Sequence, residues 1–138
     1  MKTLPNIPSE LLSIALEDLK LCEKDPDYKI EMNAWHNWES RKKVCYVCLA
    51  GAFLAKSHAF PKNQTFNYTN IGNNRELDRQ IHSLNMFRCG FIGAGLSFLN
   101  IVDKKGIMSQ RVTDYSVNPS QFKKDIVSII STLKKNNL

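Results

Sequence analysis

No stretch of this sequence is both long and apolar enough to cross a bilayer, and the first two dozen residues mix proline, serine and acidic residues instead of forming the apolar run of a secretory signal. Internal repeats and low-complexity tracts are also missing. With 43% hydrophobic and 23% charged residues, the 138-residue chain has the composition of one globular domain spanning residues 1–138. We expect a cytoplasmic protein.

Cysteine and acidic residues are scarce. The four cysteines occur without secretory context, so we expect free thiols and no disulfides. Lysine and arginine number 19 against 13 aspartate and glutamate residues, which gives a net charge of +6 and a pI near 9.2. This excess of positive charge favours an anionic partner, whether nucleic acid, a nucleotide or an acidic protein.

Helical periodicity marks both ends of the chain. Pro8 and Glu10 predict the start of a first helix, whose apolar residues recur at helical spacing until Pro26 ends it. Asn118 and Gln121 flank a proline and predict a capping box for a last helix. The apolar stripe of that helix is the clearest in the chain and consists of Phe122, Ile126, Ile129, Ile130 and Leu133.

The apolar stretch 43–56, KVCYVCLAGAFLAK, predicts a buried helix that ends near Ser57 or His58. It is too long for one strand, and its small residues allow neighbouring elements to approach closely. We therefore expect the other elements to pack around this helix, and Gly51→Leu to destabilise the protein by about 1 to 3 kcal/mol through overpacking.

Strand signals are weaker. Residues 28–34 alternate apolar and polar, which predicts a strand, and residues 107–117 predict one or two extended pieces that pair with it. Residues 61–74 form the longest irregular stretch and the best candidate for a mobile or ligand-covering loop. Asn73 or Asn74 is expected to cap the helix that follows.

A further short helix is expected over residues 90–102. Together these patterns predict an α+β fold that is mainly helical, with four to five helices around a central apolar helix and a small antiparallel sheet.

Two motifs have simple structural explanations. Cys45-x-x-Cys48 could bind zinc or act in redox chemistry together with His36, yet the pair lies inside an apolar run and has no second pair at zinc-finger spacing. Small core residues explain it better, so no metal and no cofactor are expected. The glycines of residues 90–95 match neither the dinucleotide nor the Walker pattern, which favours close helix packing there.

The most unusual cluster is Trp35-His36-Asn37-Trp38 with Arg41. Flat rings and a titratable imidazole beside a guanidinium suit a base, a nucleotide or a protein interface. The alternative is that one or both tryptophans cap the core at the end of a strand. His36 has no visible aspartate or serine partner, so the sequence does not support a nucleophilic enzyme.

Three further residues extend the predicted ligand site. Arg88, Arg111 and Tyr115 could hold an anion, and the arginines could equally pair with surface carboxylates. The predicted ligand-binding residues are therefore Trp35, His36, Trp38, Arg41, Arg88, Arg111 and Tyr115. The many lysines form no long tract, and we expect them to make up a solvated face.

The motifs Trp35-His36, then CYVCLAGA from Cys45, then FRCG around Arg88 resemble a group of small uncharacterised proteins of bacteriophages and prophages. The resemblance implies a viral accessory protein acting in the cytoplasm of a bacterial host. It implies no established activity.

Three hypotheses follow. The first is a non-enzymatic protein that binds a small anionic ligand, most concretely by sequestering a nucleotide immune signal of the host. The second is a protein that binds and inhibits a bacterial defence protein or nuclease, with Trp35 or Trp38 as interface anchors. The third, an enzyme using Cys45, Cys48 and His36, is the weakest. A homo-oligomer is expected, because a small domain forms a deep pocket most easily between copies.

Overall fold

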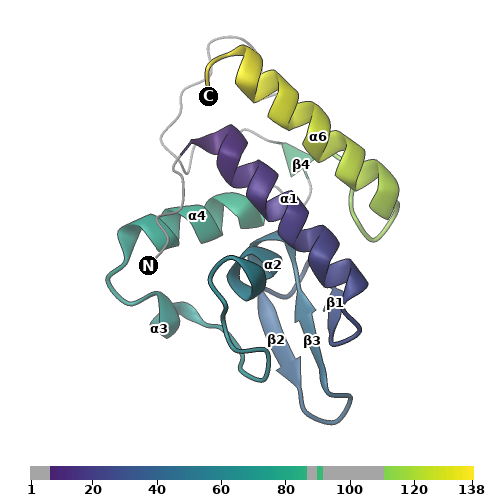
Figure 1. The fold of residues 1–138 in the computed structure, drawn as a ribbon, viewed down its shortest axis with the longest axis vertical. Helices are drawn as coiled ribbons and strands as arrows, with labels where there is room; N and C mark the ends of the chain where they lie inside the picture. The colour runs from purple at the N-terminus through teal and green to yellow at the C-terminus, as the bar shows by residue number, and fades with distance from the viewer. Residues whose placement is uncertain (1–6, 87–89, 92–110) are drawn as a thin grey trace.

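A computed structural model describes residues 7–86, 90–91 and 111–138 of the chain, and it confirms a mainly helical α+β fold (Figure 1). In chain order the elements are α1 (Pro8–Lys24), β1 (Tyr28–Ile30), β2 (His36–Glu39), β3 (Val44–Val47), α2 (Leu49–Lys56), α3 (Tyr68–Ile71), α4 (Arg75–Met86), β4 (Gly90–Phe91), β5 (Arg111–Val112) and α6 (Pro119–Lys135). Within these ranges no helix has the length and apolarity needed to span a bilayer.

Helices α1 and α6 lie side by side and run in opposite directions (Figure 1). The predicted start of α1 is confirmed, with Pro8 in the first turn and the carboxylate of Glu10 near the positive end of the helix dipole. The helix ends where Asp25 becomes extended ahead of Pro26. Its buried face packs against α2 and α6 and consists of Ser9, Leu11, Leu12, Ala15, Leu16, Asp18, Leu19 and Cys22.

Helix α6 is also confirmed. The side chain of Asn118 accepts a hydrogen bond from the backbone N–H of Gln121 at 3.0 Å, as an N-cap residue should. The reciprocal half of the predicted capping box is wrong, because the N–H of Asn118 donates to the carbonyl of Asp114 at 3.2 Å and the side chain of Gln121 donates to Asp125 at 2.8 Å. All five residues of the predicted apolar stripe are buried.

The prediction of one helix over residues 43–56 is wrong in its first half. Val44–Val47 form β3, the central strand of the larger sheet, and α2 begins only at Leu49. A continuous apolar run shows no periodicity, and the length of this run wrongly favoured a single helix because the run contains both a strand and a helix. The valines and the tyrosine of β3 have high strand propensity. The second half remains the apolar centre, because every residue from Leu49 to Ala55 is buried.

The three-stranded sheet has the order β1-β3-β2 and is mixed, with β1 parallel and β2 antiparallel to β3. The predicted pairing of residues 28–34 with residues 107–117 is therefore wrong for residues 111–117, and residues 107–110 lie outside the described residues. Strand β5 pairs instead with β4 in a separate two-stranded sheet. The error follows from the missed strand, since β3 takes the place beside β1 that the late extended segment was expected to fill.

The alternation in residues 28–34 predicted burial better than secondary structure. The strand stops at Ile30, and a turn follows in which the N–H of Ala34 donates to the carbonyl of Glu31 at 3.1 Å. Met32 and Ala34 are nevertheless buried while Glu31 and Asn33 are exposed.

The irregular stretch 61–74 contains one short helix, α3, which has a capping box at Asn67. Phe66 is buried in this stretch, and its N–H donates to the carbonyl of His36 at 2.9 Å, which fixes the segment along β2. Asn74 caps α4 as predicted, since its side chain accepts from the N–H of Leu77 at 3.0 Å. A ligand-covering role for this loop stays a prediction.

The helix predicted over residues 90–102 is wrong at its start, where Gly90–Phe91 form β4, and its remainder lies outside the described residues.

Candidate ligand-binding groove

His36, at the centre of the predicted ligand site, belongs to the core. Its side chain is 0% exposed. The ring lies edge-on to Phe60 with 4.9 Å between ring centroids, and Nδ1 is 2.9 Å from the carbonyl oxygen of Gln64. Burial lowers the pKa of His36 from its ordinary value, because desolvation disfavours the imidazolium. The ring is enclosed by the core and not presented at the surface, so ligand binding by His36 stays a prediction that its packing does not support.

The two tryptophans pack at the margin of the core. Trp35 is half-buried and meets the ring of His82 edge-on at 5.2 Å and the ring of Phe66 at 6.0 Å. Trp38 is also half-buried and packs against the core, while its backbone N–H donates to the hydroxyl of Thr65 at 3.2 Å. This arrangement agrees with the alternative in which the tryptophans cap the core.

Of the predicted arginines, the structure describes Arg41 and Arg111. Arg41 is exposed in the turn between β2 and β3, at the opposite end of the molecule from α6 (Figure 1). Arg88 lies outside the described residues. Among the predicted site residues that the structure describes, Trp35, His36 and Trp38 lie close together in the chain at β2, where they pack against or within the core.

Within the described ranges, the cysteines do not form part of a set of metal ligands. Cys45 Sγ lies 3.4 Å from His36 Nδ1, and Cys22, Cys45 and Cys48 are all buried free thiols. Burial raises the pKa of Cys22 and of Cys45 to about 12. No group of three or more histidine, cysteine or acidic side chains that could hold a metal ion occurs in the part of the chain that the structure describes.

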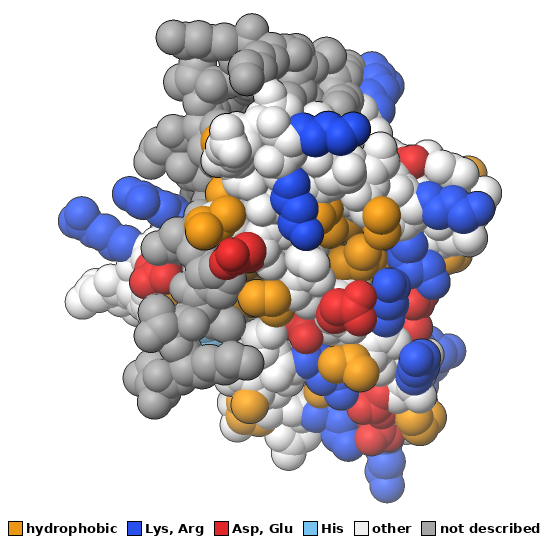
Figure 2. Space-filling view, turned by 45° about the horizontal axis from the view of Figure 1, so that its top comes forward, with side chains coloured by type: hydrophobic (Ala, Val, Ile, Leu, Met, Phe, Trp, Pro, Cys, Tyr) orange, Lys and Arg blue, Asp and Glu red, His pale blue; other side chains and the backbone are white. Residues whose placement is uncertain are grey.

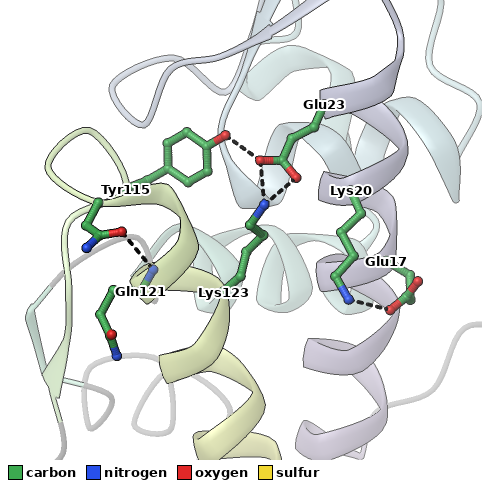
Figure 3. Close-up of polar contacts among 7 residues, drawn as sticks. Glu17, Lys20, Glu23, Tyr115, Gln121 and Lys123 are labelled. Carbon is green, nitrogen blue, oxygen red and sulfur yellow. Dashed lines mark hydrogen bonds and ion pairs between the residues drawn. The ribbon is translucent and has the colours of Figure 1, made fainter.

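Arg111 and Tyr115 lie beside α6, far from the tryptophans in the sequence and at a different place in the fold. Arg111 is exposed and lines a shallow hollow with Asp125. The hydroxyl of Tyr115 donates to Glu23 Oε2 of α1 at 2.6 Å, and its ring meets Phe122 edge-on at 5.6 Å (Figure 3). Tyr115 therefore joins the last helix to the first.

A groove runs between the C-terminal half of α1 and the N-terminal half of α6, next to this contact. It encloses about 520 Å³, which lies within the roughly 300 to 1,000 Å³ of small-molecule sites. Four lysines, one glutamate, one serine and one valine line it: Lys20, Lys24, Lys123, Lys124, Glu23, Ser120 and Val127. Figure 2 shows lysine and arginine side chains, with acidic ones among them, around exposed hydrophobic side chains on one face of the molecule.

The four lysines differ in their partners. Lys20 Nζ is 3.2 Å from Glu17, and Lys123 Nζ is 3.0 Å from both carboxylate oxygens of Glu23 (Figure 3). Lys24 and Lys124 form no ion pair with any described residue. The groove is therefore lined by more positive than negative charge, and two of its cations have no acidic partner among the described residues.

Sequence reasoning missed this groove, because it treated the dispersed lysines as a solvated face. The residues come from two helices separated by about a hundred positions, and only the packing of α1 on α6 brings them together. The local signal was present in Lys20 and Lys24, one helical turn apart, and in the adjacent Lys123 and Lys124.

The chain matches no protein-family model, and the comparisons with curated proteins and with solved structures gave no match either. The phage resemblance therefore stays a prediction.

Proposed function

We propose that this protein is a non-enzymatic binder of a small anionic ligand, and that the groove between α1 and α6 is its site. The observation that supports this most is the convergence of Lys20, Lys24, Lys123 and Lys124 from two helices on one groove. An anion placed there gains attraction from several cations at once, which a lone surface lysine does not provide.

The chemistry of the groove suits a ligand with both a charged and an apolar part. Exposed ion pairs contribute about 0.2 to 1 kcal/mol each, so lysines alone fall short of the about 8 kcal/mol that micromolar affinity requires. Apolar contact has to add the remainder. Val127, which is 53% exposed, and the methylene chains of the lysines offer that surface.

A nucleotide has this combination of parts. Its phosphates would lie against Lys24 and Lys124 near the start of α6, and its base or sugar would lie on Val127. With the phage resemblance, this supports a finer proposal: a phage or prophage accessory protein that sequesters a nucleotide immune signal in the bacterial cytoplasm. A homo-oligomer would deepen the open groove by placing a second copy over it.

An alternative is a protein that binds and inhibits a bacterial defence protein or nuclease. Two exposed apolar side chains favour it: Val127, which lines the groove and is 53% exposed, and Val117, which precedes α6 and is 78% exposed. An acidic partner surface would match the lysines and cover these valines. Trp35 and Trp38 are poorer anchors than the sequence suggested, because both are half-buried.

Calorimetric titration of the full chain with ATP and with a cyclic dinucleotide, at low ionic strength, tests the proposal. We expect saturable binding that weakens as salt is added, because salt screens exposed charges. Chromatography of the recovered nucleotide should show that it is unchanged. A product in that chromatogram would contradict the non-enzymatic assignment. No binding of either probe would contradict a nucleotide ligand and favour the protein partner.

A further inference from the structure

We infer that Glu23 is an internal anion that occupies the groove, holds Lys123 in place of a ligand and thereby limits the affinity of the site for anions. This inference rests on the proposed function, because it concerns the same groove. It assigns to one acidic residue a role in regulating binding.

Glu23 is the only acidic side chain that lines the described part of this groove, and it is well fixed there. Lys123 Nζ donates to both of its carboxylate oxygens at 3.0 Å, and the hydroxyl of Tyr115 donates to Oε2 at 2.6 Å (Figure 3). Three hydrogen bonds from two donors therefore hold the carboxylate on the α6 side of the groove.

Tyr115 serves as a stable donor in this arrangement. Burial raises the pKa of its phenol, and the neighbouring carboxylate of Glu23 raises it further, so the hydroxyl keeps its proton at neutral pH. The edge-on contact with Phe122 fixes the ring. Tyr115, which the sequence predicted as a ligand contact, thus acts on the ligand through Glu23.

The consequence for an incoming anion is competition. A phosphate group can reach Lys24 and Lys124 without displacing any acidic side chain that the structure describes, but it can bind Lys123 only by displacing Glu23 or by sharing the lysine with it. The charge of Glu23 also repels the phosphate. If Glu23 served only to join the two helices, its removal would lower the stability of the protein but would leave the affinity for anions unchanged.

The variant Glu23→Gln removes the charge and keeps the shape. We expect it to bind ATP about three- to tenfold more tightly than the parent at low ionic strength, since it frees one cation and removes one repulsion. Glu10→Gln is the matched control, because it makes the same change in net charge at the exposed far end of the same helix. It should change the affinity less than twofold, owing to screening over that distance.

A double-mutant cycle tests whether the effect passes through Lys123. In a Lys123→Gln background, Glu23→Gln should raise the affinity for ATP by less than it does in the parent, because there is no longer a lysine for it to free. Tyr115→Phe is a second, milder variant that loosens Glu23 without removing its charge, and it should raise the affinity by about twofold or less.

The outcomes separate the two proposals. If the parent binds ATP and Glu23→Gln binds equally well, or gains as much with Lys123 absent, the role of Glu23 is refuted while the groove remains the site. If neither the parent nor Glu23→Gln binds ATP, both proposals fail. A fall in thermal stability with unchanged affinity would show that Glu23 only joins α1 to α6.

Discussion

The carbonyl oxygen of Trp35 lies against Gly51, so close that a β-carbon at Gly51 would be 1.5 Å from it. The same oxygen accepts a hydrogen bond from the N–H of Cys48 at 3.4 Å. The chain entering β2 is therefore pressed directly onto the start of α2, and only glycine fits at this contact. This explains structurally why a glycine interrupts the otherwise apolar helix.

Gly51→Ala should lower the free energy of unfolding by about 3 kcal/mol, at or above the upper end of typical overpacking costs. Helix propensity alone would favour alanine by about 1 kcal/mol. A decrease in the free energy of unfolding therefore supports the contact between Gly51 and the carbonyl of Trp35, and an increase argues against it. Gly51→Leu should be worse still. Urea denaturation followed by circular dichroism measures both.

Gly72→Ala is the control for that experiment. Gly72 has a positive φ of 57°, but an added β-carbon would meet nothing within 4 Å. Its cost should come from backbone strain alone, about 1 to 3 kcal/mol, because Gly72 combines the positive φ with a ψ of −131°. If Gly51→Ala proved as stable as the parent, the close approach of Trp35 would be wrong.

The sequence predicted those parts of the fold in which apolar residues recur at regular spacing. Helices α1 and α6 follow from apolar residues at helical spacing with a proline or asparagine at the start. Strand β3 could not be predicted in the same way, because it is buried within a continuous apolar run that shows neither period. Once β3 was missed, the partner of β1 was also misplaced.

The candidate site was less predictable than the fold. Trp35 and His36 stand out by residue type, but residue type does not show burial, and their contacts with Phe60, Phe66 and His82 come from distant segments. The lysine groove depends on the packing of α1 against α6, which no local pattern records.

Burial of His36 predicts a loss of stability in mild acid. Because the folded-state pKa lies below the ordinary value of about 6.5, unfolding takes up a proton when the pH falls below 6.5. The contribution of neutral His36 is therefore complete above pH 6.5 and is lost progressively as the pH drops toward the folded-state pKa.

Melting temperatures at pH 7.5 and pH 5.5 measure this effect. The parent should melt lower at pH 5.5, and His36→Gln should show a smaller difference between the two values. An equal difference in both proteins would mean that His36 does not titrate with unfolding.

Buried thiols predict slow modification in the folded state. Cys22 and Cys45 have pKa values of about 12 through burial, and Cys48 is likewise buried. The fourth cysteine, Cys89, lies outside the described residues, so a Cys89→Ser variant leaves only the three buried thiols. Since the thiolate is the reactive form, we expect this variant to react with a thiol reagent at least about tenfold more slowly when folded than in urea. Fast labelling of one equivalent under native conditions would contradict the packing described around β3 and α2.

Stoichiometric zinc in purified protein would revive the enzyme hypothesis.

The most direct test of the central claim compares two lysine pairs in ATP binding. Lys24→Gln with Lys124→Gln removes the two available cations of the groove, whereas Lys134→Gln with Lys135→Gln removes the same charge at the exposed last turn of α6. The groove pair should weaken binding about tenfold, which corresponds to two contacts of about 0.7 kcal/mol each, and the control pair should weaken it less than twofold. Equal weakening by both pairs would mean that ATP senses only net charge, and the groove between α1 and α6 would not be its site.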